Sequence, residues 1–553
     1  MRLSLKTRFL SLLITPAIVF GFSSAPAHAA DYVPVNGAGS SWSANAIDQW
    51  RRNVVQYGMR VNYASTGSSD GRNQFKAGTV DFASSEIPYG LKDGSVEDSL
   101  PSRAFAYIPL VAGGTAIMYN LKIGGKRFTN LKMSGDTLTK IFTGVITFWD
   151  DKAIAAENPG ISLPKRKIVP VVRSDGSGST AQFTSWMADE HTKIWDDYCK
   201  LAGRSTPCGL TSNYPVVSGK GYVSQPGSQG VSGYVSQNAN EGTITYVEYS
   251  YALKTGFPVV KLLNASDHYV LPTASNVAVA LLKAKIDTRP GKTYLTQILT
   301  DVYSSKDPRS YPLSSYSYVI VPTAVSGSFT AAKGQTLGDY VAYSLCEGQQ
   351  QAEVLGYSPL PVNLVKAGLE QVKKIPGVTA KSIDVAKCNN PTFSSDGTNL
   401  LAKNAPMPPA ADKKGYTGTD TGASGIVDPG TDPGTDPGTD PGTDPGTDPG
   451  TDPGTDPGTD PGTDPGTDPG TGGNSSGGGY VDNGGIVDNG IVGPGFCDND
   501  TGICQAVSAE AITPPDQNGT IFAQIQIIFL LILFLALLLA GPVISIIRRG
   551  SQR

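Results

Sequence analysis

The sequence predicts an α/β fold in two lobes for residues 31 to about 405. Short runs rich in β-branched and aromatic residues alternate there with stretches whose apolar residues recur at helical spacing, which is typical of an α/β protein. Three of the strand-like runs lead through Gly and Ser directly into a helical pattern. This part of the chain is longer than one hydrophobic core usually serves, so we expect two lobes.

The expected elements follow from the two periodicities. Short apolar runs predict strands, and longer stretches with apolar residues three and four positions apart predict helices. Strands are expected at 106–109, 116–119, 168–172, 243–247 and 318–322, and helices at 136–142, 274–286, 294–302 and 337–345.

The three strand-to-helix junctions lie at 33–50, 60–77 and 167–186. The first N–H groups of a helix have no partner inside it, and they carry a partial positive charge. Glycine lets a bound oxyanion approach such a helix start closely. Arg173, at the exit of the third strand, adds a planar cation that suits a tetrahedral oxyanion. One junction alone could be a Ser-capped turn with a surface arginine, but three in one domain favour an anion-binding site.

Residues 1–29 are expected to be a secretory signal peptide. Arg2, Lys6 and Arg8 form a charged start, 9–20 are apolar, and the small residues around Ala29 suit cleavage. The mature chain is therefore expected to begin at residue 30, outside the cytoplasm.

Residues 406–520 are expected to be a disordered linker. Eleven copies of Asp-Pro-Gly-Thr fill 428–471, and such a sequence cannot bury a core. Fully extended, the repeat would reach roughly 140 Å, which suits a spacer across a thick cell wall. The alternative interpretation is a tolerated low-complexity expansion.

Residues 525–547 are predicted to be a transmembrane helix. The stretch 527–547 carries no charge and is long enough to cross a bilayer. Arg548 and Arg549 follow it, so 548–553 is expected to be a cytoplasmic tail. These features predict a single-pass protein of the cell membrane with its globular part at the cell surface.

The six cysteines are expected to form disulfides, because exported proteins favour them over thiolate metal sites. Fifteen pairings are possible, and local pairing suggests Cys199 with Cys208, Cys346 with Cys388, and Cys497 with Cys504. The two histidines of the mature chain lack metal-ligand spacing, so neither a metal nor a cofactor is expected. The globular part is mildly basic but has no dense basic patch with interleaved aromatics, which argues against nucleic acid.

Several motifs, in order, resemble the phosphate-binding proteins of bacterial phosphate ABC importers, the PstS family. These are Gly-Ala-Gly-Ser-Ser-Trp at 37–42, Asn-Tyr at 62–63 leading to Gly-Ser-Ser-Asp-Gly at 67–71, Gly-Thr-Val-Asp-Phe-Ala-Ser-Ser-Glu-Ile-Pro at 78–88, Arg-Ser-Asp-Gly-Ser-Gly-Ser at 173–179, and the segments 219–221 and 242–252. The resemblance covers roughly 35–400, and the repeat, the Cys497 loop and the C-terminal span lie outside it.

The resemblance implies a type II periplasmic-binding-protein fold whose two lobes close on inorganic phosphate about a hinge. Lobe 1 would comprise about 30–110 and 253–405, and lobe 2 about 111–252. An ABC permease in the membrane would be the partner. The phosphate contacts that the resemblance implies are Ser41, Trp42 through its backbone N–H, Ser68, Glu86, Arg173, Ser177, Gly178 and Ser179.

Two positions depart from the family's pattern. Glu86 stands where the family has Asp, and Asp70 stands where it has Gly beside Ser68. We expect the Glu86 carboxylate to select phosphate by accepting a hydrogen bond from a protonated phosphate oxygen. Asp70 is the next candidate for this role. Asp70 could instead pair with Arg72.

Two other classes of function compete with phosphate capture. A hydrolase would need a nucleophile, but Ser177 has Asp175 and Ser179 where a nucleophile elbow has glycines, so we expect no enzyme. The second is a surface-displayed adhesin, matrix or phosphate-storage protein on the same fold, which the long spacer and single span would suit.

Overall fold

The computed structural model is organised on one mixed sheet of eight strands, in the order β11-β10-β12-β6-β17-β3-β1-β2. Strands β1, β2 and β3 are parallel, as are β10, β11 and β12, whereas β6 and β17 run antiparallel to their neighbours. The predicted α/β class is therefore confirmed. The strands are β1 Val35–Gly39, β2 Val61–Ala64, β3 Phe82–Ser85, β6 Phe105–Tyr119, β10 Val169–Arg173, β11 Val223–Gln225, β12 Thr243–Glu248 and β17 Ser314–Pro322.

The structure describes residues 32–93, 96–291, 293–379, 383–416 and 426–427. The predicted signal peptide, the repeat, the Cys497 loop and the span at 525–547 lie outside these residues. Within the described ranges, no helix combines the length and the apolar character needed to cross a bilayer.

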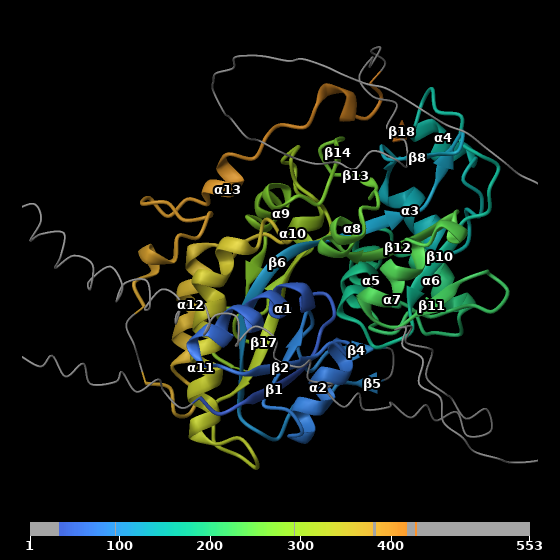
Figure 1. The fold of residues 1–553 in the computed structure, drawn as a ribbon. Coiled ribbons are helices and arrows are strands. Elements are labelled where there is room, and N and C mark those ends of the chain that lie inside the picture. The colour runs from blue at the N-terminus through green and yellow to red at the C-terminus, as the bar shows by residue number, and fades with distance from the viewer. Residues whose placement is uncertain (1–31, 94–95, 292, 380–382, 417–425, 428–553) are drawn as a thin grey trace, which may run out of the picture. The chain divides into compact units, whose positions relative to one another are not determined.

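Strand β6 divides the sheet into two parts (Figure 1). Its residues up to Gly114 pair with β17, and Thr115 to Tyr119 pair with β12. We call β17, β3, β1 and β2 the first half-sheet, and β12, β10 and β11 the second half-sheet. The two strands predicted at 106–109 and 116–119 are thus one strand. Gly113 does not break it, and a Cβ there would lie 2.6 Å from the Trp42 ring, so glycine allows a close approach.

Helices begin directly after the parallel strands of both half-sheets. Helix α1 (Ala44–Asn53) follows β1 and α2 (Ser68–Ala77) follows β2, while α5 (Gly178–Glu190) follows β10 and α7 (Gly227–Val235) follows β11. Figure 1 shows α1 and α2 beside the first half-sheet and α5 and α7 beside the second. Within each half-sheet the parallel strands end at the same edge, so their helix starts lie together. Because β3 runs in the same direction as β6 and β12 runs against it, the strands of the two half-sheets end toward the middle of β6 from opposite directions.

The remaining longer helices cover the outside of the two half-sheets. Helices α9, α11 and α12 pack on the first half-sheet or β6, and α3 and α6 pack around α5 on the second. Their bounds are α3 Gly135–Phe142, α6 Thr192–Leu201, α8 Tyr249–Thr255, α9 Ala274–Leu281, α11 Ala331–Leu345 and α12 Val362–Val372. The helices predicted at 136–142 and 337–345 are confirmed.

Two predicted helices are wrong in part. Helix α9 ends at Leu281, and Lys285–Ile286 is instead a short strand, β15, paired with β16 (Gln297–Ile298). Of the helix predicted at 294–302, only α10 (Thr300–Tyr303) overlaps it. The cause is a polar turn around Asp287, whose carboxylate accepts hydrogen bonds from the Arg289 N–H and the Thr293 hydroxyl. Such local capping outweighs apolar periodicity.

The ordered part of the chain extends beyond the predicted linker boundary at 406. Residues up to Tyr416 lie along the fold, with Asp412 buried and paired with Lys132 and Lys261 at 3.2 and 2.8 Å. The expectation of a disordered linker is therefore wrong for 406–416. The sequence of 406–416 lacks hydrophobic periodicity, so it looked like linker, but charge pairing at Asp412 holds it to the fold.

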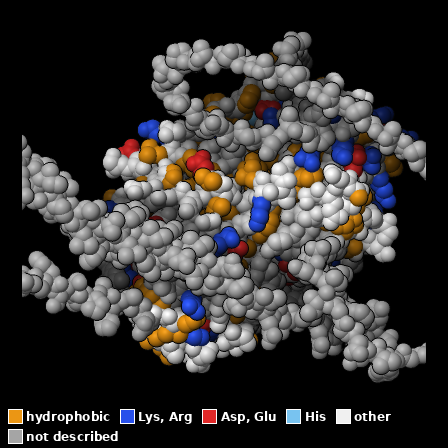
Figure 2. Space-filling view, in the orientation of Figure 1, with side chains coloured by type: hydrophobic (Ala, Val, Ile, Leu, Met, Phe, Trp, Pro, Cys, Tyr) orange, Lys and Arg blue, Asp and Glu red, His pale blue; other side chains and the backbone are white. Residues whose placement is uncertain are grey.

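Two predicted disulfides are confirmed, between Cys199 and Cys208 and between Cys346 and Cys388. The third, between Cys497 and Cys504, lies outside the described residues. On the face drawn in Figure 2, Lys and Arg side chains are spread among apolar and acidic ones.

Candidate oxyanion-binding site

The predicted junctions meet where helix starts from both half-sheets converge. The hydroxyl of Ser68, at the start of α2, accepts a hydrogen bond from the Gly178 N–H at the start of α5, at 3.1 Å. The two residues are 110 positions apart in the sequence. Nearby, the Ser69 N–H donates to the Gly176 carbonyl at 3.0 Å. The structure therefore brings the second and third junctions together.

Glu86 follows β3 and is fully buried between these helix starts. Its Oε2 accepts the Ser68 hydroxyl at 2.7 Å, and its Oε1 accepts the hydroxyls of Ser40 and of Ser317, the latter at 2.9 Å. A Cβ at position 178 would lie 1.9 Å from Oε2, so only glycine fits opposite this carboxylate. Glu86 is thus a carboxylate surrounded by hydroxyl donors from three separate parts of the chain.

Arg173 ends β10 and is 3% exposed. Its Nε donates to Asp175 Oδ1 at 2.7 Å and its Nη2 to Oδ2, whereas Nη1 makes only a 3.4 Å contact with the Ser228 hydroxyl. Burial by itself would raise the pKa of Asp175, but hydrogen bonding to Arg173 and its charge outweigh burial and hold the pKa below its ordinary value. Asp175 therefore fixes the position of the guanidinium through Nε and Nη2. Nη1 has the weakest hydrogen bond of the three nitrogens, so it is the donor best placed to bind a ligand.

The first junction contacts the second half-sheet as well. The Ser41 hydroxyl accepts the Ser228 N–H at 2.9 Å and lies 2.9 Å from the Ser228 hydroxyl. The backbone N–H of Trp42 donates to the Ser40 hydroxyl at 3.0 Å, and its indole N–H donates to Thr115 at 3.2 Å. Gly37 and Gly39 belong to β1 itself and do not form a separate turn.

The start of α5 offers both a cap and an unengaged hydroxyl. Ser177 is the N-cap, and its hydroxyl accepts the Thr180 N–H at 3.2 Å. Ser179 is 1% exposed, and its hydroxyl has no hydrogen-bond partner among the described residues. A buried hydroxyl of this kind costs free energy unless something accepts or donates at it. It is therefore available to an oxyanion at this helix start.

Sequence reasoning missed four polar partners of the site: Ser40, Asp175, Ser228 and Ser317. Ser228 carried a usable signal, because β11 leads through Pro-Gly-Ser into α7, the same junction pattern as the other three. Ser317 carried none, since it lies inside the buried strand β17.

Asp70 does not face this cluster. It accepts a hydrogen bond from Gln74 at 2.5 Å, one turn further along α2, and this contact is exposed. The alternative pairing of Asp70 with Arg72 is also wrong, because Arg72 binds Asp98 at 3.0 Å and the Ile87 carbonyl. Asp70 is thus a poor candidate for a ligand contact.

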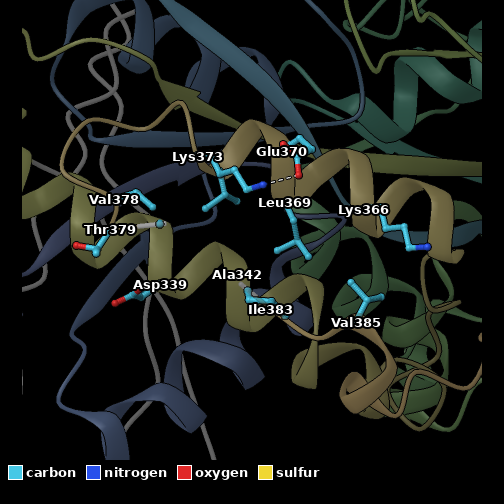
Figure 3. Close-up of a pocket in the computed structure, with 12 residues that line it drawn as sticks. Asp339, Ala342, Lys366, Leu369, Glu370, Lys373, Val378, Thr379, Ile383 and Val385 are labelled. Atoms are coloured by element: carbon cyan, nitrogen blue, oxygen red, sulfur yellow. Dashed lines mark hydrogen bonds and ion pairs between the residues drawn. The ribbon is translucent and has the colours of Figure 1, made fainter. Parts of the chain in front are cut away.

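A hollow lies between α11, α12 and the residues Val378, Thr379, Ile383 and Val385 (Figure 3). None of the predicted site residues lines it. Lys373, one of its charged residues, pairs with Glu370 at 2.6 Å on the same helix. No group of three His, Cys, Asp or Glu side chains suited to a metal occurs in the part of the chain that the structure describes. The converging helix starts are therefore the candidate site.

Comparison with known proteins finds a matching family model and several named relatives. Residues 24–346 match the model of a PBP superfamily domain. The phosphate-binding protein PstS of Xylella fastidiosa is 32% identical over 337 residues, which is 60% of this chain and 83% of that protein. PstS of Methanocaldococcus jannaschii is 29% identical over 62% of this chain and 86% of that protein. A crystal structure of a phosphate-binding protein from Stenotrophomonas maltophilia aligns with 66% of this chain and 99% of its own, at 16% identity and a TM-score of 0.45.

Proposed function

The chain belongs to the PBP superfamily and, within it, to the family of the phosphate-binding protein PstS, and we propose that it captures inorganic phosphate for an ABC importer. One observation carries the proposal: the Ser68 hydroxyl links Glu86 to the Gly178 N–H, so predicted contacts from distant parts of the chain form one buried cluster. Phosphate would bind there through helix-start N–H groups, serine hydroxyls and Arg173.

The proposed fold is of type II, with the first half-sheet in lobe 1 and the second in lobe 2. Strands β6 and β12 connect the lobes, since β6 pairs on both sides and β12 ends at Glu248, opposite Thr115. The return boundary near 253 stays a prediction. Beyond it, β13 (Lys261–Leu263) pairs with β9 (Lys132–Met133), a strand from the predicted lobe 2.

The polar groups of the site suit a monohydrogen or dihydrogen phosphate. The hydroxyls, N–H groups and Arg173 can all donate, whereas Glu86 accepts. A ligand that carries both bare and protonated oxygens satisfies both kinds of group. The named relatives are binding proteins rather than enzymes, and we propose the same for this chain.

We further propose that this domain lies outside the cell and is held by the predicted span through the repeat. The signal peptide, spacer and span on which this rests lie outside the described residues. Protease added to intact cells stripped of their wall should release the domain. Retention of the intact protein in the cytosol would rule the topology out.

Phosphate binding is tested directly by calorimetry on the purified chain, with sulfate as the competitor. We expect one phosphate per chain and no heat of binding with sulfate near neutral pH. A chain that binds neither anion would exclude phosphate capture, and surface display would then be the better account.

A further inference from the structure

A second set of contacts joins the two proposed lobes outside the phosphate site. Asp93 belongs to β4 (Lys92–Asp93), in a hairpin that follows β3 in lobe 1. Its Oδ1 binds the Arg204 guanidinium at 2.5 Å, and its Oδ2 accepts the Thr211 hydroxyl at 2.7 Å and the Ser212 N–H at 3.2 Å. All three partners come from one loop of lobe 2, so a single carboxylate makes contacts across the lobes with both of its oxygens.

This loop is attached to the start of α5. The Ser212 carbonyl accepts the N–H of Ser177, the α5 cap, at 2.9 Å. Thr211 donates its N–H to the Thr184 hydroxyl at 2.9 Å and accepts that hydroxyl at its carbonyl at 2.9 Å. Asp93 therefore holds the N–H of Ser212, the residue whose carbonyl positions the Ser177 turn.

The Arg204 end of the loop is also fixed. Arg204 lies inside the ring closed by the disulfide between Cys199 and Cys208. The Cys208 N–H donates to the Asp196 carboxylate at 2.8 Å on α6. The loop thus presents a prearranged set of donors to Asp93, which reduces the entropy lost when they engage.

A hollow lined by residues of both proposed lobes surrounds this contact. Its lining includes Arg72, Asp93 and Asp98 from lobe 1 and Arg204 and Ser212 from lobe 2, and none of the predicted phosphate contacts. Asp98 differs from Asp93, because it pairs with Arg72 at 3.0 Å and Lys76 at 3.2 Å, both on α2 of its own lobe. Asp93 is therefore the acidic residue of this hollow whose partners lie across the gap.

We propose that Asp93 is a positioning residue that holds the lobes closed over the ligand without touching it. The inference rests on the proposed function, because it takes phosphate binding to require lobe closure. Contacts made only in the closed state raise affinity and slow release, since they must break before the ligand leaves.

The matched substitutions are Asp93→Asn and Asp98→Asn in the full chain. The Asp93 carboxylate is 26% exposed, so the ion pair alone is weak, but three hydrogen bonds weaken together. We expect Asp93→Asn to raise the Kd for phosphate on the order of 10-fold, mostly through faster release. Asp98→Asn should leave the Kd within about twofold of the wild type, because a pair within one lobe is present in both states.

Radiolabelled phosphate gives the Kd, and stopped-flow tryptophan fluorescence gives the release rate. Arg204→Ala combined with Asp93→Asn should weaken binding no more than the stronger single change, because both remove one interaction. If Asp93→Asn leaves the Kd and release rate unchanged in a chain that binds phosphate, the inference is wrong. Equal effects of Asp93→Asn and Asp98→Asn would also overturn it.

A ligand-free measurement separates this inference from the proposed function. Fluorophores at Leu100 and Leu201, which are 39% and 57% exposed on the two sides, report the separation of the lobes. Asp93→Asn should lengthen the mean separation without any phosphate. If the wild type ignores phosphate but this shift is seen, the proposed ligand is wrong and the closing contact stands. If the separation of the lobes is the same in Asp93→Asn and in the wild type, Asp93 does not hold the lobes closed.

Discussion

Glu86 has one acceptor position left for a ligand. A carboxylate oxygen can accept about two hydrogen bonds, and Oε1 already accepts from Ser40 and Ser317. Oε2 accepts only from Ser68, and it faces Gly178 at the start of α5. A protonated phosphate oxygen can donate there, whereas an ionised sulfate oxygen would meet repulsion. Rejection of the wrong anion then follows from a hydrogen bond that cannot form.

Substitution of Glu86 should therefore change selectivity. The wild type is expected to prefer phosphate over sulfate by roughly 10⁴-fold, the scale at which polar sites reject analogues. Glu86→Gln should admit sulfate, because the amide can donate to an ionised oxygen. Competition titrations with both anions measure this. Asp70→Asn is the control and should change neither affinity, since among the described residues Asp70 is hydrogen-bonded to Gln74 on its own helix and not to the site. If the Glu86→Gln variant still excludes sulfate and keeps its phosphate affinity, Glu86 is not the residue that recognises the protonated phosphate oxygen.

Arg173 should supply much of the binding free energy. A charge-assisted hydrogen bond contributes about 1.5–3 kcal/mol, which is roughly 10- to 200-fold in affinity. Arg173→Ala should weaken phosphate binding by at least that factor, and Arg173→Lys should rescue it poorly because an ammonium cannot span both oxygens of Asp175.

Calorimetry gives these affinities, and circular dichroism checks that each variant is folded. Arg166→Ala is the matched control, since Arg166 forms a partly exposed pair with Glu241 in the same proposed lobe. Full affinity in Arg173→Ala would place the phosphate elsewhere.

At the scale of elements, local patterns were predictable and long-range partners were not. The junctions at Ser68 and Ser177 were found because a strand, a Gly/Ser turn and a helix start lie within a few residues. Ser317 could not be found, because its role depends on β17 pairing with β3 across more than two hundred positions. The missed turn at Asp287 shows the converse, where a local polar cap overrode the apolar pattern of the surrounding stretch.

The two disulfides should have separable effects. By loop entropy, the bridge of Cys199 with Cys208 contributes about 2–3 kcal/mol and that of Cys346 with Cys388 about 4 kcal/mol, because their sequence separations are 9 and 42. Replacing the second pair by serine should cost more stability in denaturant unfolding. Only loss of the first pair should also weaken phosphate binding, because its ring carries Arg204. Equal binding losses from both replacements would show that stability alone governs affinity.

At the scale of the whole molecule, composition distinguishes the globular part from the repeat, but it places the end of the globular part too early in the sequence. The repeat is plainly distinct in sequence, whereas 406–416 looks like more linker because it lacks apolar periodicity. Its attachment is ionic: Asp412 is 5% exposed between two lysines from β9 and β13. Sequence spacing could not reveal this, since Lys132 and Lys261 are far from Asp412 along the chain.

The segment 406–416 should therefore stabilise the domain. The Ala402 and Ala405 carbonyls accept hydrogen bonds from Arg309, and the chain then reaches Asp412, which pairs with Lys261 of β13. Removing the carboxylate leaves Lys132 and Lys261 with reduced compensation at largely buried positions. Asp412→Asn should lower the free energy of unfolding by about 2 kcal/mol, less than for a fully buried pair because the lysines keep some exposure.

A chain ending at Ala405 should lose at least as much stability relative to one ending at Tyr416. Urea unfolding measures both, with Asp384→Asn as the control, since Asp384 and Lys387 form an exposed pair. If chains ending at 405 and 416 unfold at the same urea concentration, the segment lies on the domain without stabilising it, and the predicted boundary at 406 is the better description.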